Sequence, residues 1–301
     1  MTTSLRALFA VDGSECSAAM IRCWSAWRGA ADNALTARLL TVVPPPLHVW
    51  PGSGFDPGLI DEALRAIGRE HLADAERLMK EGQVPWQSAV RIGVPAETIV
   101  AEAQREAADL IVMGTRGLSA LRGLLVGSVA LRVAQSSPIP VWLMPPHARC
   151  PRELGRRTKL LVAVDGSEAA IQAAAWASRV APAFGSCSIE LASVRPELGP
   201  VGAALGVPVD TTRNWDQQLG IAAIHAARAA MGDAGSRAPA HIGDGPVVPA
   251  LCRVAVETDA DAIVVGPRNL GALGKATLGS VSSALLQTAT CSVVIVRGEV
   301  A

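Results

Sequence analysis

Residues 8–20 read LFAVDGSECSAAM, and residues 161–173 read LVAVDGSEAAIQA. In both stretches a short apolar run ends at Asp-Gly-Ser, and a segment with helical character follows. The spacing holds elsewhere: Asp12 and Asp165 are 165 − 12 = 153 positions apart, and Gly114 and Gly266 are 266 − 114 = 152 apart. A register kept to one residue over this length indicates duplication of a whole domain rather than a short solenoid repeat.

Short apolar runs alternate with helical segments in both copies. Strands are expected at residues 5–11, 35–43, 88–92, 110–114 and 139–144, and again near 159–164, 188–194, 239–242, 262–266 and 292–297. Helices are expected between them, including 59–80, 96–107 and one from Ser128. This alternation is typical of an α/β fold with a parallel sheet covered on both faces. We therefore predict two tandem five-stranded domains whose ligands bind beyond the carboxyl ends of the strands.

The boundary between the copies is marked by composition. Residues 147–158, HARCPRELGRRT, are polar and rich in arginine and carry a proline, which indicates a linker. The predicted organisation is a first domain at 1–146, a linker at 147–157 and a second domain at 158–301. With 301 residues, the chain is long enough for two ordinary cores.

Charge and cysteine content narrow the class of protein. The formal net charge is zero, which gives no reason to expect nucleic acid or a membrane surface as a partner. Six scattered cysteines without a C-x-x-C pair predict no disulfide framework. Neither a secretory leader nor an apolar run long enough for a membrane span is evident in the sequence. A cytoplasmic location is expected.

Glycines recur where the fourth strand ends and the next helix begins. Residues 113–130 read MGTRGLSALRGLLVGSVA, with Gly114 and Gly117 followed nine residues later by Gly127-Ser128. Glycine allows close approach by a ligand, and the first amides of a helix are unpaired and partly positive. The pattern therefore favours a phosphate pocket. The alternative is that the glycines only form turns and Gly-Ser only starts a helix.

The G-2x-G-9x-G-[S/T] spacing, the VDGSE after the first strand and SSPIPVWLM at 136–144 resemble the universal stress protein family, twice over nearly the whole chain. The resemblance implies tandem Rossmann-like (HUP-type) domains. It also implies a site for ATP, with ADP or AMP as alternatives and Mg²⁺ as a companion ion. The residues implied are Asp12, Val42, Met113, Gly114, Arg116, Gly117, Gly127, Ser128 and Val129 in the first copy, and Asp165, Val194, Gly266, Arg268, Gly279 and Ser280 in the second.

Asp12 also has a purely local explanation. A carboxylate at the end of a strand can accept from a ribose hydroxyl or from the amino group of adenine. Alternatively, Asp12-Gly13 forms a tight corner, and Ser14 caps the next helix. Both roles remain open from the sequence.

The second copy departs from the motif. Pro267 stands where the first copy has Thr115, and Asn269 stands where it has Gly117. Proline removes a backbone donor, and asparagine adds a side chain where phosphates would lie. Lys275 is a candidate to compensate. We expect a competent first site and a weak, altered or vacant second one.

Several other functions lack their motifs. The sequence contains no Walker A loop, no G-x-G-x-x-G after the first strand, no H-E-x-x-H and no G-x-S-x-G. The five histidines are isolated, and none has the spacing of metal ligands. We consider three hypotheses: an ATP-binding regulator with a protein partner, a scaffold that binds no nucleotide, and a slow ATPase.

The remaining aromatic and apolar signals concern contacts. Trp24, Trp27, Trp86 and Trp142 are expected in the core or at an interface. Trp50 in the loop 44–58 is expected to be a surface-anchored loop residue, with the covering of a nucleotide as the alternative. By the resemblance, the last strands, IPVWLM and CSVVIV, pair the two domains within the chain. Association of two chains into a homodimer stays open.

Overall fold

The computed structural model describes residues 4–28, 35–46, 56–117, 126–148, 157–194, 204, 209–267 and 278–297. The first half contains β1 (Leu5–Ala10), α1 (Glu15–Arg28), β2 (Leu35–Val43), α2 (Pro57–Glu81), β3 (Trp86–Ile92), α3 (Pro95–Arg105), β4 (Leu110–Gly114), α4 (Ser128–Ser136) and β5 (Val141–Met144). The second half contains β6 (Thr158–Ala163), α5 (Glu168–Val180), the 3₁₀ helix η1 (Ala181–Phe184), β7 (Cys187–Val194), α7 (Val209–Ala230), α8 (Asp233–Ser236), β8 (Ala240–Gly243), α9 (Val247–Glu257), β9 (Ala262–Val265), α10 (Ser280–Thr288) and β10 (Ser292–Ile295).

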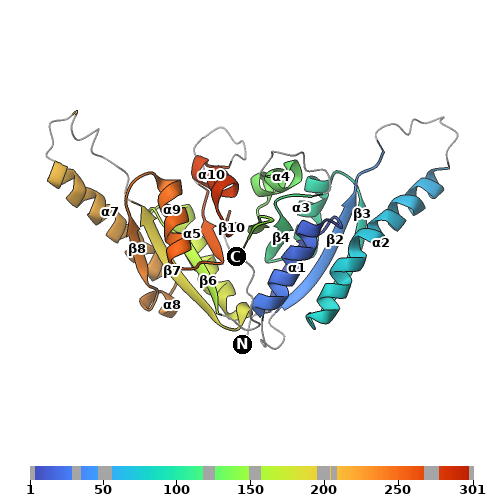
Figure 1. Cartoon of the computed structure of the whole chain (residues 1–301), viewed down its shortest axis with the longest axis horizontal. Coiled ribbons are helices and arrows are strands. Elements are labelled where there is room, and N and C mark those ends of the chain that lie inside the picture. Colours follow the sequence, from blue (N-terminus) through green and yellow to red (C-terminus); the bar gives the residue numbers. More distant parts are fainter. Residues whose placement is uncertain are drawn as a thin grey trace.

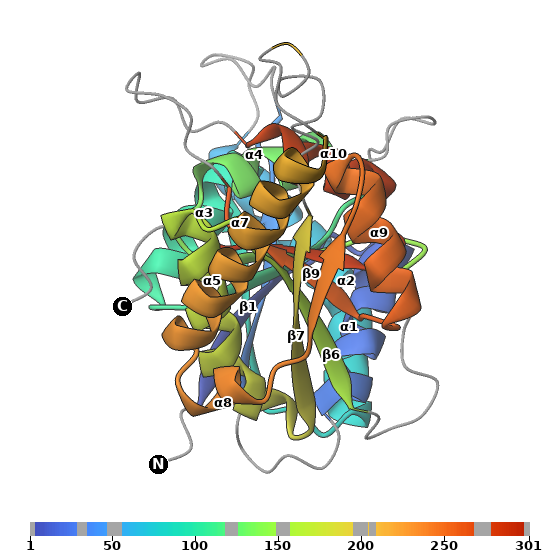
Figure 2. The same cartoon turned by 90° about the vertical axis from the view of Figure 1, so that its left-hand side faces the viewer.

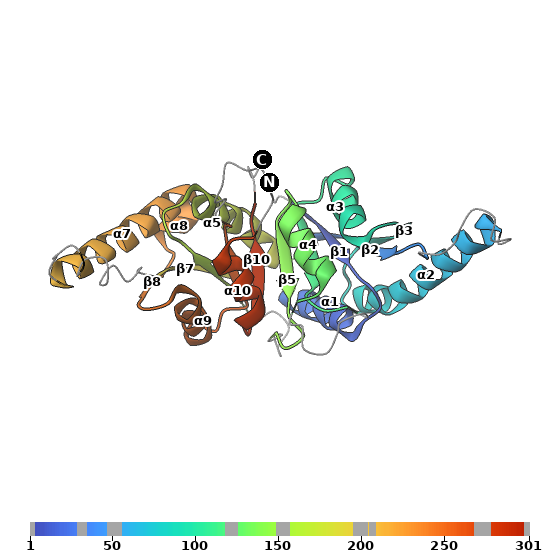
Figure 3. The same cartoon turned by 90° about the horizontal axis from the view of Figure 1, so that it is seen from above.

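The strands of both halves form one sheet. Its order is β3-β2-β1-β4-β5-β10-β9-β6-β7-β8. Pairing is parallel within each half, whereas β5 and β10 pair antiparallel, with Trp142 opposite Val294. These two strands lie side by side at the centre of the molecule, with one half on either side (Figures 1 and 3). The predicted pairing of the last strands within the chain is therefore confirmed.

Helices cover both faces of this sheet. Figure 2 looks onto the second half, where α5 and α7 lie on one side of the strands and α9 lies on the other. One apolar core contains side chains from α1, α2, α5 and α7, and a second contains side chains from α3, α4, α9 and α10. Each core includes residues of both halves, so the duplication produces two shared cores rather than two separate ones.

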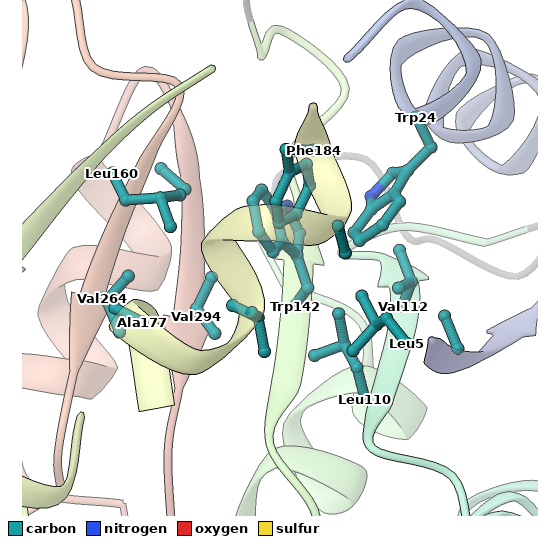
Figure 4. Packing of buried hydrophobic residues seen from close by; sticks show 14 of the residues in the cluster. Leu5, Trp24, Leu110, Val112, Trp142, Leu160, Ala177, Phe184, Val264 and Val294 are labelled. Atoms are coloured by element: carbon teal, nitrogen blue, oxygen red, sulfur yellow. The ribbon is translucent and has the colours of Figure 1, made fainter. Parts of the chain in front are cut away.

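Aromatic rings fill the junction between the halves. Trp24 of α1 and Trp142 of β5 are buried, with ring centroids 5.1 Å apart. Phe184 of η1 packs against both indoles, at 5.3 Å and 5.7 Å (Figure 4). The expectation that Trp24 and Trp142 lie in the core or at an interface is confirmed. Trp86 is partly buried against the same core, and the side chain of Trp27 lies outside the described part.

The predicted strands are all present, with ends shifted by up to two residues. The helix expected at 59–80 spans Pro57–Glu81, because Asp56 caps it by accepting from Gly58 N at 2.8 Å and Pro57 begins it. The short helices η1 and α8 were not predicted. Trp50 lies outside the described residues, as does most of the proposed linker, so the limits 1–146, 147–157 and 158–301 stay a prediction.

One cysteine departs from the expectation. Cys16, Cys187, Cys252 and Cys291 are free, but Cys23 is disulfide-bonded. Cys23 is buried in α1, and the linear spacing of cysteines carries no information about which of them the fold brings together. The expected absence of disulfides therefore does not hold at Cys23. Among the described helices, none combines the length and apolar character needed to cross a bilayer.

Close packing of α2 gives a test of the fold. A β-carbon on Gly68 would overlap Val90 Cγ1 and lie 3.1 Å from Thr41 Cγ2. A β-carbon on Gly220, the corresponding residue of α7, would lie 3.5 Å from Ser193 Oγ, which is an ordinary contact. We expect Gly68→Ala to lower the free energy of unfolding by about 1–2 kcal/mol through overpacking. Gly220→Ala should instead be neutral or raise it by up to about 1 kcal/mol. Urea denaturation of both variants checks this, and equal effects would contradict the packing difference.

Candidate nucleotide site

A pocket of about 480 Å³ opens at the carboxyl ends of β1, β2 and β4. This is where the strand order reverses, since the chain passes from β1 outward to β3 and then returns to β4 on the other side. Every site residue predicted in the first half lines this pocket: Asp12, Val42, Met113, Gly114, Arg116, Gly117, Gly127, Ser128 and Val129. The fold thus brings together residues that lie more than a hundred positions apart in sequence.

Asp12 is held in place by the turn after β1. Its Oδ1 accepts from Ser14 N at 3.1 Å and from Ser17 Oγ at 2.7 Å. Gly13 has φ +76°, which only glycine adopts without strain, and Ser14 Oγ accepts from Ser17 N at 3.3 Å as a helix cap. The local role of Asp12 is therefore present in the structure, and the turn positions the carboxylate at the pocket wall.

The three motif glycines each meet a different neighbour. A β-carbon on Gly114 would lie 2.7 Å from Cys16 Sγ, and one on Gly117 would overlap Asp12 Oδ2. The amide of Gly127 donates to Thr115 O at 2.6 Å, so it is not available to a ligand. Gly114 and Gly117 thus make room for side chains in the pocket wall, a reason that neither reading of the sequence included. They allow this wall to close around Asp12 and the start of α4.

The start of α4 faces the pocket. Gly127 is its N-cap and supplies no side-chain acceptor, and Ser128, Val129 and Ala130 line the cavity. The amides of a first helical turn have no acceptor within the helix and carry a partial positive charge. This is a suitable environment for an anionic group.

Two further polar groups point to a ligand. Arg116 and Thr115 both line the pocket. Within the described part of the chain, Arg116 Nε and Thr115 Oγ1 are buried without a hydrogen-bond partner. Such groups cost free energy unless something else pairs with them. The part of the lining formed by Thr115 and Arg116 therefore contains donors that have no acceptor among the described residues.

The apolar part of the lining consists of Ala10, Leu40, Val42, Pro95, Ile99 and Met113. Helix α3, which carries Pro95 and Ile99, packs beside α4. An apolar slot beside a donor-rich end fits a ligand with a flat organic part and an anionic part. Pro95 and Ile99 of α3 and His71 of α2 were not predicted as site residues. No signal in the sequence shows which faces of α2 and α3 reach the ends of the strands.

The Cys16 thiol, which lies next to Gly114 of the pocket wall, is not activated. Burial raises the pKa of the Cys16 thiol, the Asp12 carboxylate adds to this, and Arg116 opposes it. The thiol therefore stays protonated near neutral pH and is a poor nucleophile. Among the described residues, no three His, Cys, Asp or Glu side chains gather in a way that could hold a metal ion.

The second half retains part of this arrangement. Gly279 caps α10 with φ −60° and ψ 156°, close to the −71° and 152° of Gly127, and Ser280 begins the helix. Asp165 is exposed and accepts from Ser167 N at 2.9 Å. Ala170 stands where the first half has Ser17, and the hydroxyl that donates to Asp165 Oδ1 is instead Ser167 Oγ, at 2.5 Å.

Of the other site residues predicted in the second half, the structure describes Val194 and Gly266 but not Arg268. Val194 ends β7, and a β-carbon on Gly266 would overlap the carbonyl of Ala169 in α5. Gly266 thus makes room for the start of α5. Pro267 is buried. Arg268, Asn269 and Lys275 lie outside the described residues, so their predicted effect on a second site is not tested.

Comparison with known proteins gives consistent results. The model of the universal stress protein family matches residues 4–145 and again 156–297. A universal stress protein of Mycolicibacterium smegmatis is 26% identical over 294 residues, covering 96% of each chain. A universal stress protein of Methanocaldococcus jannaschii is 42% identical over 83 residues, which span 28% of this chain and only 49% of that protein. The crystal structure of a universal stress protein from Archaeoglobus fulgidus superposes with a TM-score of 0.66 at 20% identity, covering 97% of this chain and 98% of the other.

Proposed function

Because this chain belongs to the universal stress protein family, with two such domains in tandem, we propose that it is an ATP-binding regulatory protein of the stress response. The nucleotide is held mainly in the first half. The observation that carries the proposal is the pocket where Asp12, Gly117 and the start of α4 converge. ADP and AMP are the alternative ligands, and the proposed location is the cytoplasm.

Different parts of the pocket bind the base and the phosphates of the nucleotide. The apolar slot beside Val42 and Met113 accommodates the base, and Asp12 accepts from the base or the ribose. Arg116 and the amides of Ser128 and Val129 bind the phosphates. Mg²⁺ would be bound with the phosphates of the nucleotide. We assign no catalytic residue.

The joined sheet favours a second role that does not need a nucleotide. Antiparallel pairing of β5 and β10 makes each half the partner of the other. A scaffold that works through such contacts, with or without a second chain or a regulatory protein, is the alternative function. Nucleotide content decides between the two.

The first test is the nucleotide bound per chain. The purified protein is denatured with acid, the released compound is identified, and the emptied protein is titrated with ATP and Mg²⁺ by calorimetry. We expect one adenine nucleotide per chain. Two per chain would contradict the restriction to the first half, and none would overturn the proposal in favour of the scaffold.

A matched pair of variants locates the site. Arg116→Ala removes a charged donor from the pocket, and we expect the Kd for ATP to rise about 10- to 100-fold. Arg268→Ala changes the same motif position in the second half and should leave that Kd unchanged. Similar effects of the two substitutions would contradict a site confined to the first half.

A further inference from the structure

His71 is a pocket residue that the family motif does not include. It lies on α2, is half-buried, and lines the pocket together with Asp12 and Val42. No hydrogen bond or ion pair joins it to another residue in the described part of the chain. The imidazole therefore lies at the pocket wall with two ring nitrogens that have no hydrogen-bond partner among the described residues.

The fold does not require histidine at this position. A β-carbon on Gly13 would lie 3.1 Å from the Cα and Cδ2 atoms of His71, so the ring packs against the turn after β1. In the second half the same turn, with Gly166 at φ +80°, packs against Ala223 instead. Both turns have nearly the same conformation, because Gly13 has φ +76°. The turn can therefore form without a histidine beside it, and the histidine is present only in the first half, where the pocket lies.

The topology places His71 at one end of the pocket. Helix α2 packs on β2, β3 and α1, so His71 approaches β1 from the β2 side. The start of α4 approaches from the other side, where β4 and β5 lie. A ligand whose phosphates meet α4 would therefore present its nucleoside to His71.

We propose that His71 contacts the nucleoside part of the bound nucleotide, at the ribose or the adjoining base edge, and makes the first-half site selective for nucleotides over free polyphosphate. This inference rests on the proposed function of the pocket. It assigns a role to a side chain of α2 beside Asp12 and leaves the phosphate contacts to α4 and Arg116.

The test compares two probes, ATP and inorganic tripolyphosphate, on the full-length protein. We expect His71→Ala to raise the Kd for ATP about 3- to 10-fold, the value of one hydrogen bond, and to leave the Kd for tripolyphosphate unchanged. His71→Gln, which keeps a donor and an acceptor, should recover part of the affinity. Glu70→Ala, an exposed neighbour on the same helix, is the control and should change neither Kd.

The outcomes separate this inference from the proposed function. ATP binding that is unchanged in His71→Ala overturns the role of His71 but leaves the nucleotide site standing. An equal loss for both probes also overturns it, because it would place His71 at the phosphates. A wild-type protein that binds no ATP overturns both. Circular dichroism confirms folding, and Ala223 indicates that alanine fits this position.

Discussion

Replacing Gly117 by asparagine should raise the Kd of the first-half site for ATP by about 100-fold or more while the chain still folds. The substitution copies Asn269 of the second half. Its β-carbon would overlap Asp12 Oδ2, so either the carboxylate or the segment 115–117 must move. Both line the pocket, and either shift removes several ligand contacts together. Calorimetric titration with ATP measures the loss, and circular dichroism checks the fold.

A double-mutant cycle measured as the free energy of unfolding shows whether a side chain at position 117 clashes with Asp12. Gly117→Ala adds only the overlapping atom, and we expect it to destabilise the protein when Asp12 is present. In the Asp12→Ala background the overlap is gone, and Gly117→Ala should lower the free energy of unfolding by less. The expected coupling energy between the two substitutions is about 0.5–3 kcal/mol. Unchanged ATP affinity in Gly117→Asn would contradict the site assignment. An additive cycle would instead show that the clash lies elsewhere.

The strands could be predicted because each is a short apolar run bounded by turn residues. Residues 110–114, for example, form β4 with both faces covered. The ends of β3 were harder, because Trp86 and Gln87 are not fully buried and do not stand out from the preceding loop. The pairing of the two last strands within the chain was implied only by the family resemblance, and a single sheet of ten strands was not predicted. Nothing in the local pattern specifies that β5 pairs with β10.

The site could be predicted to the extent that it lies at strand ends and helix starts. Asp12, Gly117 and Ser128 follow from that rule. His71 and Ile99 do not, because their approach to the pocket depends on how α2 and α3 pack on the sheet. The sequence favours ligand approach as the role of the motif glycines, and the structure adds that Gly114 and Gly117 make room for Cys16 and Asp12. A motif identifies the position of a residue better than the physical reason for it.

Corresponding positions of the two halves carry side chains of different size at the junction. Trp142 of β5 lies opposite Val294 of β10, and the position in α5 that corresponds to Trp24 is Ala177. Trp24 and Trp142 of the first half thus have small counterparts in the second, and Phe184 of η1, a large side chain of the second half, closes the cluster (Figure 4). A first domain paired with its own copy would oppose Trp142 with a second Trp142. This complementarity favours pairing within the chain.

Phe184→Ala should therefore lower the free energy of unfolding by about 3–5 kcal/mol. Phe184 is 3% exposed and packs against two indoles of the other half, so its removal leaves a cavity between the halves. Denaturation followed by tryptophan emission measures the loss, because Trp24 and Trp142 border that cavity. Phe9→Ala is the size-matched control: Phe9 is fully buried and contacts Trp24 within the first half.

The two phenylalanine variants together measure how much the halves depend on each other. Similar losses for Phe184→Ala and Phe9→Ala would mean that the junction is packed as tightly as the interior of a domain. A cycle of Phe184→Ala with Trp142→Ala should then show a coupling of about 0.5–1.5 kcal/mol, as expected for an aromatic pair. A loss below about 1 kcal/mol for Phe184→Ala, beside a full loss for Phe9→Ala, would show that the β5–β10 pairing alone joins the halves. The large-to-small complementarity would then have no energetic role.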